Sequence, residues 1–158
     1  MWKEIAEQTI CGVVASPNKI VKQRTPPTMS VITKEIMKQL IYIKVYKGFM
    51  EARTVGENNE SQFRSEGLNH PRSLAGNFIE VEKTFKKVIS TQPKVLLGLI
   101  KPTVLIHLVP EMEGGYTDLE LRFFREAALG GGASKVFLMT NKFGPQLDSE
   151  LNDVKKWL

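Results

Sequence analysis

Two apolar runs separated by a helical segment constrain the fold more than any other part of the chain. The first, residues 103–110 (TVLIHLVP), is apolar except for Thr103 and His107, and the second, residues 134–140 (SKVFLMT), has a similar apolar centre. Short continuous apolar runs are typical of strands that are buried on both faces of a sheet. The order strand, helix, strand then predicts a right-handed parallel crossover. We therefore expect an α/β fold, at the border with α+β.

The segment between the two runs carries the start and stop signals of a helix. Thr117 and Glu120 have the spacing of a capping box, and apolar residues recur at helical spacing, which predicts a helix over 118–129. Gly130 stands where a left-handed C-terminal residue is favoured. The residues expected on the apolar face of this helix are Leu119, Phe123 and Ala127, with Phe124 and Ala128 beside them.

Three consecutive glycines, residues 130–132, follow this helix and precede the second apolar run. In phosphate-binding loops the glycines follow a strand and precede a helix, so that backbone N–H groups at the helix N-terminus point at the anion. Here the order is reversed, and the negative end of the helix dipole disfavours an anion. The glycines are therefore predicted to turn the chain rather than to bind phosphate.

The stretch 40–55 (LIYIKVYKGFMEARTV) predicts a β-hairpin with Lys47-Gly48 at its turn. A short third strand is predicted within 62–67 (QFRSEG), followed by irregular chain. The two faces expected from the alternation are Ile41, Ile43 and Val45 on one side, and Tyr42, Lys44 and Tyr46 on the other.

A second helix is predicted after the hairpin, in NFIEVEKTFKKVISTQP (77–93). Asn77 is its expected N-cap, Glu80 holds the glutamate position of a capping box, and Pro93 ends the helix. The following stretch, 94–102 (KVLLGLIKP), is compatible with a helical turn or with a buried strand.

The two ends of the chain give weaker patterns. Residues 1–28 combine a short amphipathic stretch with a proline-containing segment, so we expect an N-terminal arm or extension there and a single α/β domain over 29–158. After residue 140 a turn and a final short helix are predicted.

Composition and charge limit the functional classes. The chain has 158 residues, of which 42% are hydrophobic and 25% charged, as is ordinary for one soluble domain. No apolar run approaches the roughly 20 residues of a membrane-spanning helix, the N-terminus lacks the pattern of a signal peptide, and the single cysteine cannot form an internal disulfide. We therefore expect a cytoplasmic protein with no membrane partner. The net charge of +5 comes from scattered residues without interleaved aromatics, so nucleic-acid binding is the least favoured hypothesis.

The loop 110–118 holds the candidate ligand-binding residues, because it follows a predicted parallel strand at the edge where α/β proteins usually bind ligands. Its carboxylates could hold a divalent cation; alternatively Asp118 and Glu120 cap the helix while Glu111 and Glu113 are solvated. His107 is predicted to be a packed core histidine, and no histidine pair has metal-ligand spacing, so no catalytic residue, metal or cofactor is assigned. The candidate residues are Glu111, Glu113, Gly114, Gly115 and Asp118.

These segments, taken in order, resemble part of the bacterial rod-shape-determining proteins of the MreB type, which are actin-like ATPases. VLIHLVP (104–110) and REAALGGGASKVFL (125–138) are similar to their "VLV.VP" strand and "RE.A...GA..VFL" pattern, and NFIEVEKTFKKVI (77–89) is similar to their preceding helix. The resemblance covers about 40–139. It implies the first subdomain of that fold, an RNase H-like β-hairpin and mixed sheet with flanking helices. The chain is also similar to the small uncharacterised enterobacterial proteins of the YjaA type in its EMEGG loop and its NF...EK helix.

The resemblance departs from the family at the residues that handle the nucleotide. Actin-like ATPases hold the phosphates with a D-x-G-[ST] turn in the first hairpin, whereas the matching turn here is Lys47-Gly48 followed by Phe49. The second half of the fold, which closes the nucleotide cleft, has no counterpart in the 158 residues. We therefore expect no bound nucleotide and no ATPase activity.

Three functions follow as hypotheses. The first is a non-catalytic protein-interaction domain that binds a partner or forms a homodimer, because a subdomain that normally packs against another domain keeps apolar surface that must be covered. The second is a small-ligand or metal-binding remnant, possibly hydrolytic, that uses the 110–118 loop. The third is a weak nucleic-acid binder.

Overall fold

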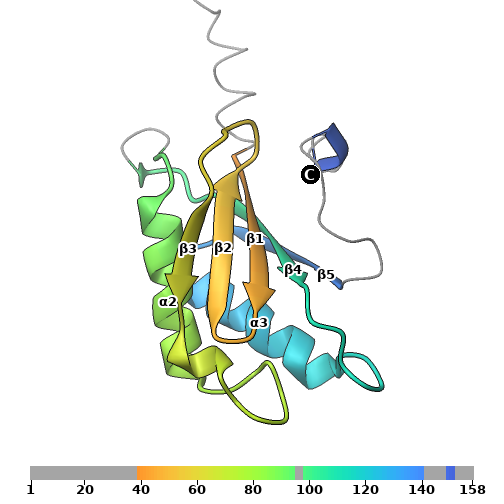
Figure 1. Ribbon diagram of the computed structural model, residues 1–158. Helices are drawn as coiled ribbons and strands as arrows, with labels where there is room; N and C mark the ends of the chain where they lie inside the picture. Colours follow the sequence, from red (N-terminus) through yellow and green to blue (C-terminus); the bar gives the residue numbers. More distant parts are fainter. Residues whose placement is uncertain (1–38, 95–97, 141–148, 152–158) are drawn as a thin grey trace, which may run out of the picture.

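The computed structural model describes residues 39–94, 98–140 and 149–151, and in this part a five-stranded mixed sheet is flanked by helices (Figure 1). The strand order is β3-β2-β1-β4-β5. The α/β class is as predicted, while the expected arm over 1–28 lies outside the described residues. The elements are β1 (Leu40–Tyr46), β2 (Phe49–Thr54), β3 (Ser61–Arg64), the 3₁₀ turn η1 (Glu66–Leu68), α2 (Phe78–Thr91), β4 (Thr103–Leu108), α3 (Asp118–Gly130) and β5 (Lys135–Thr140).

The strands β1 and β2 form the predicted antiparallel hairpin. Tyr46 pairs with Phe49, which leaves Lys47 and Gly48 as a two-residue turn, and Gly48 has a φ of +82° that suits glycine there. The predicted third strand also forms and pairs antiparallel with β2. The alternation of β1 is confirmed, since Ile41, Ile43 and Val45 all belong to the main core cluster.

The strands β4 and β5 join the other side of the sheet in parallel, as the strand–helix–strand order predicts. β4 is a central strand whose Ile106 and His107, on opposite faces, are both fully buried. The prediction that the second apolar run is equally buried is wrong: in the described part β5 is the last strand of the sheet, and Phe137 is 38% exposed. An apolar run in the sequence indicates a strand, but it does not indicate how many other strands lie beside that strand.

Both helices begin as their capping signals predict. The Asn77 side chain accepts a hydrogen bond from the Glu80 N–H at the start of α2, and Thr117 and Glu120 complete a reciprocal capping box at the start of α3. α2 ends at Thr91, two residues before Pro93. Of the ambiguous stretch that follows, residues 98–100 form a turn rather than a strand, and residues 95–97 lie outside the described residues.

The end of α3 differs from the prediction. Gly130 is still helical, Gly131 caps the helix with a φ of −68°, and the left-handed residue is Gly132, with a φ of +113°. The contact with α2 explains why glycines stand here: a Cβ at Gly131 would lie 2.7 Å from the Cβ of Phe85, and one at Gly130 would lie 2.5 Å from a carboxylate oxygen of Glu82. The glycines thus let α3 end against α2 and turn the chain towards β5.

The buried face of α3 also differs from the prediction at one residue. Phe124, Ala127 and Ala128 are fully buried and Phe123 is partly buried, but Leu119 is 77% exposed. Each helical residue advances by about 100°, so Leu119 lies roughly 140° around the helix from Phe124. The apolar arc of α3 is therefore wider than one sheet can cover.

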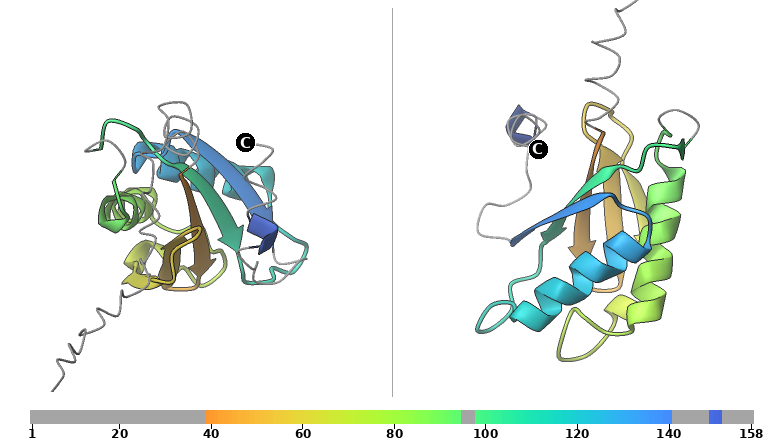
Figure 2. Two further views of the ribbon diagram at one scale, coloured as in Figure 1. Left: turned by 90° about the horizontal axis from the view of Figure 1, so that it is seen from above. Right: turned by 180° about the vertical axis from the view of Figure 1, so that it is seen from behind.

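The core lies on both faces of the sheet. The main cluster fills the space between the sheet and the two helices, which cover the same face (Figure 2). A smaller cluster on the opposite face joins Leu40, Tyr42, Val55, Leu105 and Leu151. Leu151 belongs to the short helical piece 149–151, the part of the predicted C-terminal helix that the structure describes.

Candidate functional site

The loop 110–118 lies at the carboxyl end of β4, as predicted, and all five candidate residues in it are exposed. Gly114 and Gly115 have φ values of +81° and +79°, and the Gly115 N–H donates to the Met112 carbonyl at 2.9 Å. Their left-handed backbone makes the turn of this loop. Glu111, Glu113 and Asp118 lie around that turn with their side chains in solvent.

Tyr116 closes this loop. Its hydroxyl donates to the Pro110 carbonyl at 2.6 Å, and its ring packs against the main core. Burial, with a smaller contribution from the charge of Glu120, raises the pKa of Tyr116 to about 12. The phenol therefore keeps the proton that holds the two ends of the loop together.

Glu120, which follows this loop, forms hydrogen bonds with residues of two different segments. Its carboxylate accepts hydrogen bonds from the Ser73 hydroxyl at 2.5 Å and from the Thr117 N–H at 2.9 Å. Burial opposes ionisation, but the hydrogen bonds from Ser73 and Thr117 outweigh it and hold the pKa of Glu120 below its ordinary value. Glu120 thus ties the 73–76 segment to the start of α3. Among the described residues, no group of three His, Cys, Asp or Glu side chains is placed to hold a metal ion.

An apolar groove lies beside this joint, between the N-terminal ends of α2 and α3, with a volume of about 440 Å³. The rings of Phe78 and Phe123 meet edge to face across it, with centroids 5.4 Å apart. Phe78 is 38% exposed and Leu119 77% exposed, so much of this lining faces solvent. We use the name apolar groove for the hollow lined by Ser73, Ala75, Gly76, Phe78, Leu119, Glu120, Arg122, Phe123 and Glu126.

The groove arises because both helices carry an apolar residue in their first turn. Phe78 follows Asn77, and Leu119 is the second residue of α3. The sequence pattern placed Leu119 on the apolar face of α3, since periodicity alone does not reveal which side of a helix faces the sheet. The sequence did contain one indication of an exposed apolar side chain, because the apolar residues of α3 occupy a wider arc of the helix than one sheet can cover. Burying one such side chain yields about 1.5–3 kcal/mol, which remains available to a binding partner.

The opposite face of the sheet carries polar pairs instead. His107 is fully buried and forms a hydrogen bond of 2.6 Å between its Nδ1 and the Tyr42 hydroxyl, which confirms the predicted core histidine. Lys44 contacts the carboxylates of Glu51 and Glu60 at 2.8 and 2.6 Å. Burial favours the neutral amine, but these two carboxylates outweigh it and raise the pKa of Lys44 above its ordinary value. Each of these groups has a partner within the fold, which is typical of a structural role.

Comparison with known proteins adds no assignment: no protein-family model matches this chain, and no curated protein matches it. No helix in the described ranges, 39–94, 98–140 and 149–151, has both the length and the apolarity needed to cross a membrane.

Proposed function

We propose that this chain is a non-catalytic protein-interaction domain that self-associates through the apolar groove. The observation that carries the proposal is the exposure of Phe78 and Leu119 on a hollow that already contains the ring of Phe123. Contiguous exposed apolar surface on a soluble protein marks interaction sites, and aromatic side chains supply much of the binding energy in such interfaces.

The rim of the groove suits a protein contact. Arg122 and Glu126 stand on the exposed side of α3 and line the same hollow as Phe123. An apolar centre with charged residues around it is the usual arrangement of a specific interface, and a two-fold dimer, in which each copy presents the same patch, is the commonest way to cover it. A homodimer is therefore the form of the proposal that we would test first.

Descent from the first subdomain of an actin-like ATPase is part of the proposal. Support comes from the β-hairpin and from the parallel strands added beside it, together with the two helices on one face. At the hairpin turn, the Gly48 N–H donates to the Leu68 carbonyl and the Gly48 carbonyl accepts from the Ser65 N–H. Because neighbouring chain uses these backbone groups, we propose that no nucleotide binds here. A cytoplasmic location is a separate part of the proposal.

Sedimentation of the full chain across the micromolar range tests self-association. The wild type is expected to show a concentration-dependent dimer, and Leu119→Ser, which removes an exposed apolar side chain without touching the core, is expected to sediment as a monomer. Leu99→Ser is the matched control, because Leu99 is 85% exposed and does not line the groove. A wild type that stays monomeric throughout, or an equal effect of the two substitutions, would contradict the proposal.

A further inference from the structure

The outer side of α3 carries four exposed side chains in a regular order. Leu119 is 77% exposed and Leu129 37% exposed, and Arg122 and Glu126, which stand between them, are exposed as well. At about 100° per residue, the four side chains lie within about 80° of one another around the helix. We call these four residues the α3 stripe. The right-hand view of Figure 2 shows α3 in front of the sheet, as the outer layer of the molecule on that side.

The order of residues in the α3 stripe is self-complementary. Arg122 and Glu126 lie equally far from position 124 on its two sides, and so do Leu119 and Leu129. The two pairs also share the same mean direction around the helix. In a two-fold contact, a residue that meets a second residue of the other copy is met in return by that second residue. Two antiparallel copies of α3 that cross at position 124 would therefore place each Arg122 against a Glu126. The same arrangement would place each Leu119 against a Leu129.

The two charged side chains of the α3 stripe are available for such a contact. Within the ranges that the structure describes, the side chains of Arg122 and Glu126 form no ion pair or hydrogen bond. Both residues line the apolar groove, as Leu119 does, so the stripe is continuous with that surface. A parallel arrangement of two α3 helices would place each charge opposite the same charge, which costs free energy. The charges therefore favour the antiparallel arrangement.

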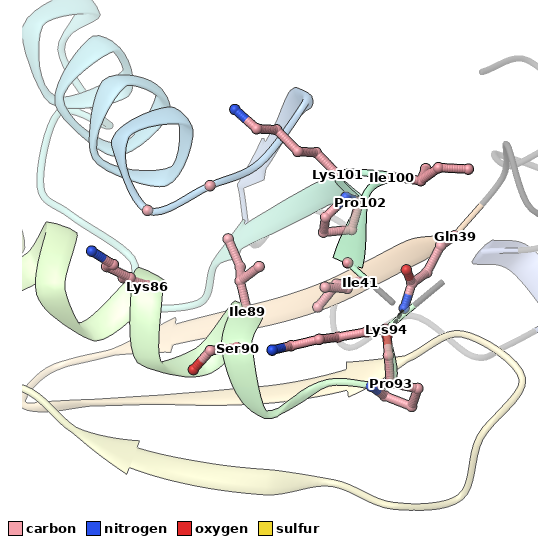
Figure 3. Close-up of a pocket in the computed structure, with 13 residues that line it drawn as sticks. Gln39, Ile41, Lys86, Ile89, Ser90, Pro93, Lys94, Ile100, Lys101 and Pro102 are labelled. Carbon is pink, nitrogen blue, oxygen red and sulfur yellow. Dashed lines mark hydrogen bonds between the residues drawn. The ribbon is translucent and has the colours of Figure 1, made fainter. Parts of the chain in front are cut away.

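A hollow at the C-terminal ends of α2 and α3 is less suited to a second copy. It has a volume of about 290 Å³, and the charged residues that line it, among those the structure describes, are Lys86, Lys94 and Lys101 (Figure 3). A two-fold contact through this hollow would bring lysines of both copies together without a carboxylate from the described lining. The α3 stripe, which carries both signs of charge, avoids this repulsion.

We propose that two copies of this chain pair their α3 helices in antiparallel orientation. Arg122 of each copy then contacts the partner's Glu126, and Leu119 contacts the partner's Leu129. This inference rests on the self-association proposed above and adds to it the orientation and the residues that make it selective. Burial of the leucines favours association, whereas the two charged pairs fix the direction and the register of the helices.

Charge reversal tests this pairing, with sedimentation of the full chain at micromolar concentrations as the measurement. Arg122→Glu leaves two acidic residues in the α3 stripe and Glu126→Arg leaves two basic ones, so like charges would meet in each variant dimer. Each variant alone is expected to dimerise about tenfold more weakly than the wild type, or weaker still. An equimolar mixture of the two variants is expected to form a heterodimer of nearly wild-type affinity, because every acidic residue then meets a basic one.

Two further variants separate the pairing from a general effect of charge. The double variant Arg122→Glu/Glu126→Arg exchanges the two charges and is expected to dimerise as the wild type does. Lys87→Glu changes the net charge as Arg122→Glu does, but at an exposed position of α2 outside the α3 stripe, and should leave the dimer unchanged. Equal weakening by Lys87→Glu and Arg122→Glu would overturn the proposed pairing.

Failure of this inference can be told apart from failure of the proposed function. A wild type that stays monomeric would remove both. A wild-type dimer that Leu119→Ser dissociates but that both charge reversals leave intact would overturn the antiparallel pairing alone. The same holds if the mixed variants associate no more strongly than each does by itself.

Discussion

The two faces of the sheet are formed by the same strands, but different kinds of interaction dominate on each face. On the face that the helices cover, the side chains of β1, β2 and β4 are apolar and buried, apart from Thr54, which donates a hydrogen bond to Gln92. α2 adds Val81, Phe85 and Val88 to this face. On the opposite face the same strands carry the smaller apolar cluster together with side chains that meet in specific pairs. These side chains are Tyr42 with His107, Arg53 over the Tyr42 ring, and Lys44 with Glu51 and Glu60.

The difference teaches where stability and specificity reside. Apolar burial contributes about 1.5–3 kcal/mol for each large side chain and depends little on which apolar neighbour is present. A partly exposed ion pair such as Lys44 with Glu51 contributes only about 0–1 kcal/mol, because desolvation offsets most of the attraction. The helix-covered face should therefore supply most of the free energy of unfolding, and the opposite face should mainly fix how the strands align.

The largest expected effect comes from emptying the helix-covered face. Phe85→Ala removes a fully buried ring from α2 and should lower the free energy of unfolding by about 3–5 kcal/mol, since it creates a cavity beneath Gly131. Urea unfolding at equilibrium measures it. Phe49→Ala on the opposite face is the control, because Phe49 stacks on Tyr46 but stays partly exposed. Equal losses in the two variants would remove the distinction between the faces.

A smaller effect is expected from the polar pair at the centre of the opposite face. Tyr42→Phe keeps the ring but deletes the hydroxyl that contacts His107 Nδ1, so the free energy of unfolding should fall by about 1–2 kcal/mol. The same urea titration measures this loss. The Phe85→Ala variant sets the scale, and a loss from Tyr42→Phe as large as that of Phe85→Ala would mean that the opposite face carries as much stability as the core.

The smallest effect is expected at Glu120, a polar joint within the helix layer. Its pKa is lower in the folded chain than the ordinary value of 4.5, so ionised Glu120 favours the folded state. This stability is present above the unfolded pKa and is lost as the pH falls through the folded pKa. Glu120→Gln should reduce the free energy of unfolding at neutral pH by less than about 1 kcal/mol, given the partial solvent exposure. The substitution should also weaken the pH dependence of the free energy of unfolding below about pH 4.5.

Urea midpoints recorded from neutral to acidic pH measure this change in the profile. Glu113→Gln serves as the control, because it removes an equal charge from an exposed loop position. If the urea midpoints of Glu120→Gln and the wild type fell equally as the pH was lowered, the hydrogen bonds from Ser73 and Thr117 would not stabilise the ionised carboxylate.

Local patterns in the sequence were sufficient for most of the fold. The hairpin turn at Gly48, the caps at Asn77 and Thr117, and the buried strand around His107 each depend on a few neighbouring residues. Such features are encoded by backbone preferences and by the spacing of apolar residues, which can be followed along the chain. His107 was identified as a core residue for the same reason.

The features that the sequence did not predict correctly all depend on tertiary contacts. Gly130 and Gly131 stand where α3 passes close to α2, and the exposure of Leu119 follows from which side of α3 faces the sheet. The edge position of β5 depends on which strand lies beside it. The apolar groove joins segments that are distant in sequence, so periodicity within one segment gave no indication of it.

The glycine triplet affects how mutagenesis data on this protein should be interpreted. Alanine at Gly131 would force Phe85 and the backbone N–H of Lys86 away from α3, whereas alanine at Gly130 would displace only the flexible side chain of Glu82. A saturation screen for cellular abundance should therefore find Gly131 intolerant and Gly130 permissive. Intolerance at a glycine-rich turn is commonly attributed to ligand binding, but at Gly131 it would report the closeness of two helices.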